Sequence, residues 1–269
     1  YNTNKYNANT AKPGGKPSDT NPFGNWYDWQ IGTPLRYLDL LVLMYDKLTP
    51  EQVGKFTGAV KFFTPYPTHG SQNTGANKIW KCSIVAENAI LMKDGALLSQ
   101  VAPDVKTELK YVTSGDGYYA DGSFVQHNHF AYTGGYGKAL LVTLAPVINV
   151  LNGTKYALKY DDGAERVFFD TIFKSYFPVI INGGVMDMVR SREISRIGGQ
   201  DHVSGRQVIR AIISVTDLLE GEQKEQALSM VKYYMQQDDR HQIFSDKDVA
   251  EFFLEYYVSL GHILRGKEI

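Results

Sequence analysis

The stretch TPEQVGKFTGAVKFF, residues 49–63, decides the fold class of this chain. Thr49 precedes Pro50, and Gln52 lies three residues after the threonine, which is the pattern of a helix start closed by a capping box. Apolar residues then recur on one face, at Val53, Phe56, Val60 and Phe63. The sequence therefore predicts an amphipathic helix that begins directly after Thr49.

Similar helix signals recur at short intervals along the chain. Thr33-Pro34 has the pattern of an N-cap followed by a first-turn proline, and predicts a helix over residues 35–48. Thr74 opens the next helix, whose apolar residues are Ile79, Cys82, Ala86, Ala89 and Ile90. Further helices are predicted over residues 96–112, 136–151, 164–181, 205–219, 223–235 and, behind a Ser245-x-x-Asp248 cap, 249–260.

Short turns join these helices and convincing alternating strands hardly occur, so the fold class is predicted to be all-α, an array of antiparallel helical hairpins. Residues 1–24 contain almost no aliphatic residues and are predicted to form a polar loop or tail, ahead of a helical region over 25–269. Two loops, 113–133 and 183–204, are unusually long and polar, which favours a functional role. Because the sequence begins at Tyr1 rather than Met, we expect a processed or excised piece.

Composition excludes several classes of partner. The chain has 28 Lys plus Arg against 29 Asp plus Glu, so no basic field favours nucleic acid or an anionic membrane. We also expect no membrane span, because no apolar run reaches the required length. The single Cys82 excludes an internal disulfide and is predicted to be a buried hydrophobe. His127 and His129 lack acidic or thiol partners at ligand spacing, so no metal site is predicted.

Two motifs near the start of the chain are candidates for binding or catalysis. The cluster Asn25-Trp26-Tyr27-Asp28-Trp29 stands just before a predicted helix, where aromatic rings either anchor the helix or stack on sugars. In Thr74-Gly75-Ala76-Asn77, the asparagine falls in a first helical turn, beside free N–H groups and the positive end of the helix dipole. A simple cap is the alternative interpretation there.

Two further motifs lie in the long loops. Residues 116–137 read DGYYADGSFVQHNHFAYTGGYG, a composition that suits a walled polar cleft better than a core. Its Asp116 and Asp121 could form a glycosidase carboxylate pair. In Arg190-Ser191-Arg192-Glu193-Ile194-Ser195-Arg196, Arg192 and Arg196 are predicted to share one face of a helical turn, although a solvated charge run would have the same pattern.

In this order, the four motifs, together with Ile31-Gly32-Thr33-Pro34, resemble polysaccharide lyase family 8, which contains the hyaluronate, chondroitin AC and xanthan lyases. The resemblance covers nearly everything from Asn25 onward. It implies an incomplete α/α toroid followed by β-sandwich domains, with the cleft where the two meet. It also implies that helices before Asn25, the β-sandwich domains and an acidic cleft residue carried by them lie outside this sequence.

The resemblance further implies β-elimination next to a uronate. Asn77, assisted by His127, would neutralise the substrate carboxylate as negative charge develops. Tyr136 would act as combined base and acid; the alternative makes His127 the base and Tyr136 the acid. An unperturbed tyrosine has a pKa of about 10, and nearby cations lower such a value by roughly 1–3 units. Arg192 and Arg196 are the candidates for that role.

Substrate contacts are predicted for Asn25, Trp26, Tyr27 and Arg190. Relatives that act on hyaluronan often have two consecutive tryptophans where this chain has Trp26-Tyr27, and an aromatic residue where it has Ser71. These departures leave a smaller stacking surface. The resemblance makes a glycosaminoglycan such as hyaluronan or chondroitin the first expectation and xanthan the next. The enzyme is expected to be secreted and to need no cofactor. Two competing hypotheses are a toroid glycoside hydrolase using Asp116 and Asp121, and a non-catalytic polysaccharide-binding fragment.

Overall fold

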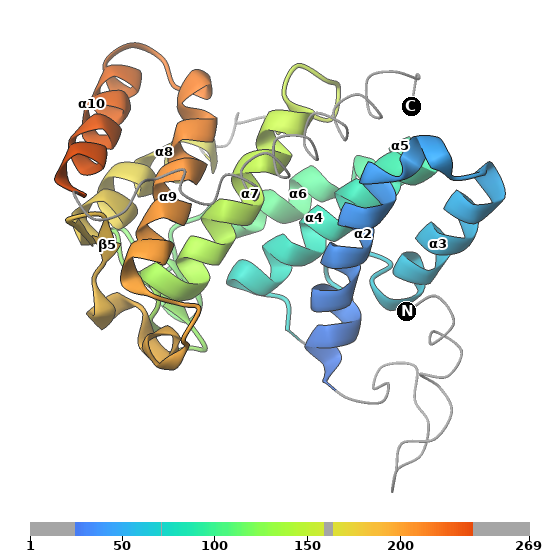
Figure 1. Cartoon of the computed structure of the whole chain (residues 1–269), viewed down its shortest axis with the longest axis horizontal. Helices are drawn as coiled ribbons and strands as arrows, with labels where there is room; N and C mark the ends of the chain where they lie inside the picture. The colour runs from blue at the N-terminus through green and yellow to red at the C-terminus, as the bar shows by residue number, and fades with distance from the viewer. Residues whose placement is uncertain (1–24, 71, 159–163, 239–269) are drawn as a thin grey trace, which may run out of the picture. The chain divides into compact units, whose positions relative to one another are not determined.

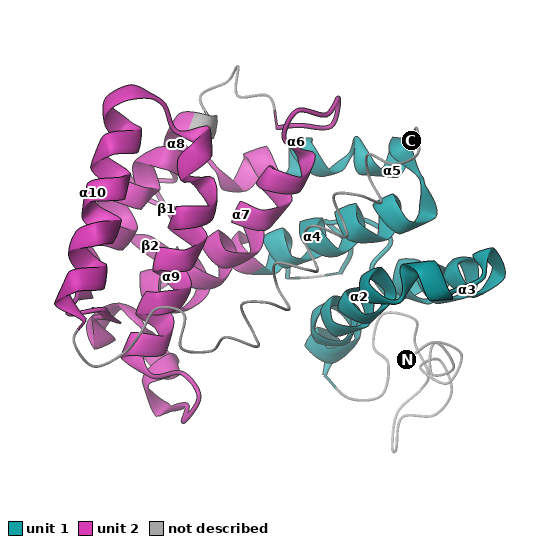
Figure 2. Cartoon of the chain, turned by 45° about the horizontal axis from the view of Figure 1, so that its top comes forward, with its two compact units in different colours: residues 1–73, 77–104, 251–269 teal, residues 74–76, 105–250 magenta. Residues whose placement is uncertain are grey.

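A computed structural model of the chain describes residues 25–70, 72–158 and 164–238 (Figure 1). The predictions for residues 1–24, Ser71 and the helix 249–260 lie outside these ranges. The described residues form two compact units (Figure 2). Unit 1 contains residues 25–73 and 77–104, and unit 2 contains residues 74–76 and 105–238, so the boundary falls inside two helices.

In the described part of unit 1, the regular secondary structure is helical. Its elements are the π-helical turn η1 (Asp28–Gly32), α2 (Thr33–Leu43), the 3-10 turn η2 (Tyr45–Lys47), α3 (Pro50–Phe63), α4 (Gly75–Met92, in unit 1 from Asn77) and α5 (Gly95–Leu98), with the start of α6 (Val101–Glu108). The all-α prediction is confirmed for this part of the chain.

The capping box predicted for α3 is confirmed. The Gln52 amide donates to the Thr49 hydroxyl over 3.2 Å, and the Thr49 amide donates to Gln52 Oε1 over 2.8 Å. Each side chain satisfies one of the orphan N–H groups that every helix start leaves. Val60 and Phe63 turn into the core, as the apolar spacing predicts.

The predicted helix start at Thr33 is wrong, because helical conformation already begins at Trp26 and continues through η1 into α2. Pro34 lacks the N–H that would bond the carbonyl of Gln30, four residues earlier. The Thr64 hydroxyl donates to that carbonyl over 2.7 Å instead. A side chain from a distant segment thus permits a proline that sequence reasoning takes for a boundary.

Helix α4 is the central helix of unit 1. All five of its predicted apolar positions are at most 2 % exposed, and Cys82 is buried, as predicted. The predicted helix 96–112 is divided into α5 and α6, and Asp94 caps α5 by accepting from the Leu97 amide over 2.9 Å.

Unit 2 contains helices and short strands. Its further helices are α7 (Lys138–Leu151), α8 (Ala164–Thr171), α9 (Asp201–Val215) and α10 (Gly221–Gln237), with π-helical turns η3 (Thr133–Gly137) and η4 (Ile172–Tyr176) and 3-10 turns η5 (Phe177–Val179), η6 (Asp187–Val189), η7 (Ser191–Ser195) and η8 (Thr216–Leu218). Helices α7 and α9 pack side by side (Figure 1).

The expectation that no segment could span a membrane needs a correction. Thr133–Leu151, which joins η3 to α7, is long and apolar enough by length and composition alone. However, 61 % of it is buried within the protein. Packing against α9 accounts for this hydrophobicity, because a core helix is apolar over most of its surface.

The two long loops contain small strands that the sequence does not predict. The first has an antiparallel meander of β1 (Gly117–Tyr118), β2 (Phe124–Gln126) and β3 (Phe130–Ala131). The second begins with a hairpin of β4 (Ile180–Ile181) and β5 (Gly184–Val185), so the helix predicted over 164–181 ends earlier. Strands of two or three residues are too short to show alternation.

Helix α9 packs against β5 through Gly205. A Cβ at this position would lie 1.8 Å from the Gly183 carbonyl oxygen, so only glycine allows the two backbones to approach this closely. Gly54 in α3 has open space around it, because a Cβ there would meet nothing within 4 Å.

We expect Gly205→Ala to lower the free energy of unfolding by about 2–3 kcal/mol, because backbone must move to admit the methyl group. Gly54→Ala is the matched helix variant and should raise it by about 0.5–1 kcal/mol through helix propensity. Urea unfolding followed by circular dichroism measures both. Equal stabilities of the two variants would contradict the close approach of α9 and β5.

Candidate functional site

Tyr136 lies in the π-helical turn η3, at the start of α7. The glycines beside it are required by packing. A Cβ on Gly134 would lie 2.5 Å from a Val185 methyl carbon, and one on Gly135 would lie 2.2 Å from the Tyr132 ring. These contacts explain the sequence Thr-Gly-Gly-Tyr-Gly, which presses the turn against its neighbours and fixes the position of Tyr136.

Two buried tyrosines hold the same turn from inside the core. The Tyr176 hydroxyl donates to the Gly137 carbonyl over 2.6 Å, and Tyr118 and Tyr176 are joined by a short hydrogen bond between their hydroxyls. Burial raises the pKa of both phenols, so both remain protonated. The backbone that carries Tyr136 is therefore anchored on a rigid core.

Tyr136 is in contact with two other aromatic side chains. The rings of His127 and Tyr136 meet edge to face with centroids 4.9 Å apart, and the Tyr132 ring lies 5.0 Å from that of Tyr136. His127 is partly exposed, but its Nε2 is buried and has no hydrogen-bond partner in the part of the chain that is described. His127 also has a left-handed backbone conformation, with φ of 57°.

Arg192 contacts the phenol of Tyr136 directly. Its Nη2 donates to the Tyr136 hydroxyl over 2.9 Å. Although partial burial opposes its charge, the hydroxyls of Tyr136 and Tyr132 raise the pKa of Arg192. The structure thus brings together His127, Tyr136 and Arg192 from three separate segments, as the sequence-based hypothesis requires.

The prediction that Arg192 and Arg196 share a helical face is wrong. Residues Ser191–Ser195 form a 3-10 turn, with about three residues per turn rather than the 3.6 that the prediction assumes, and Arg196 follows it in extended conformation. Arg196 instead pairs with Glu193 over 2.8 Å. Its guanidinium is exposed, so it remains accessible to a bound anion.

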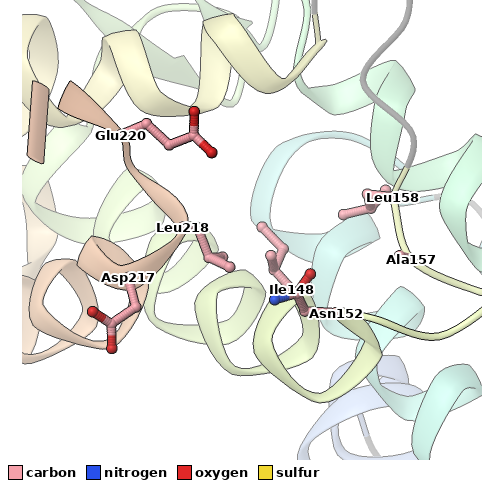
Figure 3. Close-up of a pocket in the computed structure, with 7 residues that line it drawn as sticks. All are labelled: Ile148, Asn152, Ala157, Leu158, Asp217, Leu218 and Glu220. Atoms are coloured by element: carbon pink, nitrogen blue, oxygen red, sulfur yellow. The ribbon is translucent and has the colours of Figure 1, made fainter.

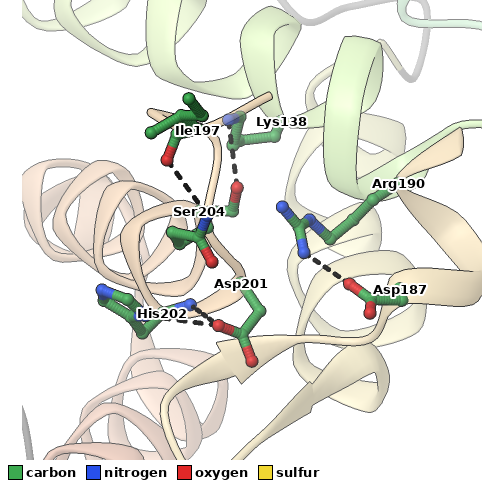
Figure 4. A network of polar contacts seen from close by, with 8 residues as sticks. Lys138, Asp187, Arg190, Ile197, Asp201, His202 and Ser204 are labelled. Atoms are coloured by element: carbon green, nitrogen blue, oxygen red, sulfur yellow. Dashed lines mark hydrogen bonds and ion pairs between the residues drawn. The ribbon is translucent and has the colours of Figure 1, made fainter. Parts of the chain in front are cut away.

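Arg190 is buried, with 3 % of its surface exposed, and donates to Asp187 (Figure 4). In the same view Lys138 at the start of α7 donates to the Ser204 hydroxyl over 3.2 Å, and Asp201 accepts from His202. Burial lowers the pKa of Lys138. Because Arg190 is buried and bound to Asp187, the structure does not support a substrate contact by its side chain.

The carboxylates of Asp116 and Asp121 accept hydrogen bonds from different partners. Asp116 accepts hydrogen bonds from Thr74, Gln126 and the amide of Asn128. Asp121 accepts from the amide and hydroxyl of Ser123, and these bonds lower its pKa. A hydrolytic general acid needs a raised pKa, so the pair does not fit the glycoside hydrolase hypothesis.

Asn77 and the aromatic cluster Asn25-Trp26-Tyr27 lie in unit 1. Asn77 is only 2 % exposed, in the first turn of α4. The Tyr27 ring packs edge to face with Trp26 over 6.1 Å and with Trp80 over 5.8 Å. Trp26 and Tyr27 are partly exposed, which is compatible with the predicted stacking surface.

Lys81 binds the segment before α4 and lies close to the Trp26 ring, and the sequence does not predict this role. It is fully buried, and its ammonium donates to the carbonyls of His69 and Gln72 over 2.6 and 3.1 Å and to Asn73 Oδ1 over 2.7 Å. The same ammonium lies 5.5 Å from the centre of the Trp26 ring. In the sequence, the position of Lys81 next to the predicted buried Cys82 is the signal that could have indicated a buried lysine.

One cavity of unit 2 lies away from the candidate residues. A cavity of about 380 Å³ is lined by Ile148, Asn152, Ala157, Leu158, Asp217, Leu218 and Glu220 (Figure 3). It lies at the C-terminal end of α7, whereas Tyr136 precedes the N-terminus of this helix. Within the described ranges no group of three His, Cys, Asp or Glu side chains could hold a metal ion.

Comparison with known proteins gives consistent matches. Residues 12–233 match the family described as polysaccharide lyase family 8, N-terminal alpha-helical domain. The chain is similar to a xanthan lyase of Bacillus sp. (strain GL1), with 34 % identity over 82 % of this chain and 23 % of that protein. It is also similar to a hyaluronate lyase of Thermasporomyces composti, with 32 % identity over 85 % of this chain and 29 % of that protein.

Solved structures of lyases also match this chain. The Streptomyces coelicolor A3 chondroitin AC lyase in complex with chondroitin sulphate matches with a TM-score of 0.80 and 30 % identity, over 91 % of this chain and 34 % of that one. The Paenibacillus xanthan lyase structure matches with a TM-score of 0.75 and 35 % identity, over 90 % of this chain and 22 % of that one. This chain therefore spans only about a quarter to a third of these relatives.

Burial lowers the pKa of Lys81 from 10.5 to about 8. Between these values the unfolded chain keeps a proton that the native state has lost, so this residue's contribution to stability rises with pH. Measured against Lys81→Met, we expect the wild-type free energy of unfolding to increase by ~1 kcal/mol per pH unit between pH 8 and 10. Urea titrations of both proteins at pH 7, 8.5 and 9.5 test this, and a pH-independent difference would contradict it.

Proposed function

The chain belongs to polysaccharide lyase family 8, and we propose that it carries the proton-transfer residues of a lyase that cleaves a uronate-containing polysaccharide by β-elimination. The observation that carries this proposal is the hydrogen bond from Arg192 to Tyr136, next to the His127 ring. A phenol that accepts a hydrogen bond from a guanidinium and lies against an imidazole suits proton transfer by side chains alone.

The reaction needs a base for the proton on C5 of the uronate and an acid for the leaving oxygen on C4. We assign both roles to Tyr136. Arg192 donates to its hydroxyl oxygen, and such a donor stabilises the negative charge that appears there when the proton leaves. The alternative assignment makes His127 the base and Tyr136 the acid, since the His127 ring lies directly against that of Tyr136.

Neutralising the uronate carboxylate is the second requirement, because the C5 proton is only weakly acidic beside an ionised carboxylate. We assign this role to Asn77 and His127, with Arg196 as an accessible cation for the polyanion. Each is a hydrogen-bond donor, and donors to the carboxylate strengthen as charge develops on it.

A glycosaminoglycan such as hyaluronan or chondroitin is the proposed substrate, and xanthan is the alternative. The relatives are named for these three polymers. Trp26, Tyr27 and Trp80 form a compact aromatic group on which the apolar face of a sugar ring could stack. Asn25 is exposed beside it and would add hydrogen bonds.

We further propose that β-sandwich domains of the same enzyme complete the cleft, and that the enzyme acts outside the cell, where such polymers occur. The segment that carries Arg192 also exposes apolar side chains, which soluble proteins normally cover. The exposed fractions are 54 % for Ile181, 78 % for Met188, 58 % for Ile194 and 94 % for Ile197.

The test is the ultraviolet absorbance of unsaturated uronate while the full-length protein is incubated separately with hyaluronan, chondroitin and xanthan. We expect a rise with one polymer, and a loss of at least about 100-fold in rate in Tyr136→Phe, because the group that transfers the proton is removed. Tyr119→Phe is the matched control, since its hydroxyl donates to the nearby Gly115 carbonyl over 2.9 Å.

Other outcomes separate the competing hypotheses. New reducing ends without absorbance would indicate hydrolysis and contradict the lyase proposal. Binding of a polymer without any new ends would favour a non-catalytic polysaccharide-binding protein. A Tyr136→Phe variant as active as Tyr119→Phe would remove Tyr136 from the chemistry.

A further inference from the structure

The carboxylate of Asp116 joins three segments of unit 2. Its Oδ2 accepts from the Thr74 hydroxyl and from Gln126 Nε2, each over 2.7 Å, and its Oδ1 accepts from the Asn128 amide over 2.7 Å. Three charge-assisted bonds at this distance hold a carboxylate in one orientation. Asp116 therefore fixes Thr74, strand β2 and the turn after β2 relative to one another.

The turn after β2 is held in an unusual conformation. His127 and Asn128 have φ values of 57° and 66°, and two consecutive non-glycine residues in the left-handed region require support from their surroundings. The bond from the Asn128 amide to Asp116 supplies that support directly next to His127. Strain of this kind is concentrated at functional sites.

Gln126 links the Asp116 carboxylate to the start of α4. Its Oε1 accepts from the Ala76 amide over 3.3 Å, while its Nε2 is bound to Asp116. Gly75 has φ of 55°, and a Cβ there would lie 2.1 Å from Gln126 Oε1, so glycine is needed for this approach. Thr74, Gly75 and Ala76 immediately precede Asn77 in the chain.

We propose that Asp116 is a positioning residue for the elimination reaction, because its carboxylate fixes the His127 turn against the Thr74–Ala76 segment that leads into Asn77. It acts through backbone and hydroxyl donors rather than through the imidazole ring. The inference rests on the proposed function. It links the Thr74–Ala76 segment and the His127 turn through the Asp116 carboxylate.

The test compares Asp116→Asn with Asp121→Asn in the full-length protein. An asparagine has the same shape but offers one acceptor oxygen and one NH₂ group, which cannot accept from the three donors. We expect kcat to fall about 10–100-fold while KM changes less than about twofold, because a displaced catalytic group costs rate. Asp121→Asn removes the same charge from the same loop, where the carboxylate accepts from the neighbouring Ser123, and should leave kcat unchanged.

Two further measurements separate positioning from general destabilisation. In a His127→Ala background, Asp116→Asn should cost less than about twofold in kcat, since coupled residues are not additive; a full 10–100-fold loss there would overturn the proposal. In ¹⁵N-histidine-labelled protein, the ring signals of His127 should shift in Asp116→Asn and not in Asp121→Asn. Unchanged His127 signals in Asp116→Asn would also overturn it.

The spectra do not depend on activity. If wild-type protein shows no elimination, the proposed function fails, and the His127 signals still test whether Asp116 positions this turn. If elimination occurs and both aspartate variants keep the wild-type kcat, the positioning role fails while the lyase assignment stands.

Discussion

The close approach of backbone segments that glycine permits is the constraint on which unit 2 depends. Gly205 brings α9 onto the turn before β5, and Gly134 and Gly135 seat the turn η3 between Val185 and Tyr132. Side chains at these positions would displace tightly packed neighbours rather than flexible groups. The Tyr136 hydroxyl can meet Arg192 because these contacts hold η3 in place.

Side chains complete hydrogen bonds that the backbone leaves open, and they do so next to the candidate functional residues. Thr64 donates to the carbonyl that Pro34 cannot serve, and thereby lets one helix run from the Trp26 region through α2. Lys81 donates to three acceptors in the segment before α4 and lies close to the Trp26 ring. Buried polar groups must be satisfied, so these bonds determine the local backbone.

Charged groups in unit 2 are divided between the interior and the surface. Arg190 is buried and bonds to the exposed Asp187, and the partly buried Lys138 bonds to Ser204, whereas Arg192 and Arg196 stay accessible. Asp116 and Asp121 are bound by hydrogen-bond donors and do not supply a hydrolytic pair. Among these groups, the Tyr136 phenol, the His127 imidazole and the Arg192 guanidinium lie in contact with one another or next to one another.

The sequence by itself determined the all-α class, the capping box at Thr49, the buried face of α4 and the four motifs, because each follows from neighbours within one turn or from residue chemistry. It misplaced the helix start at Pro34 and the shared face of Arg192 and Arg196, and it missed Lys81 and the role of Asp116. The helix through Pro34 and the bonds of Lys81 depend on partners 34 and 8 residues away, Thr64 for the Gln30 carbonyl and Asn73 for Lys81, whereas the Arg192–Arg196 turn differs in its local helix type. Only the tertiary structure decides such pairings, since local propensity carries no information about which distant donor meets which acceptor.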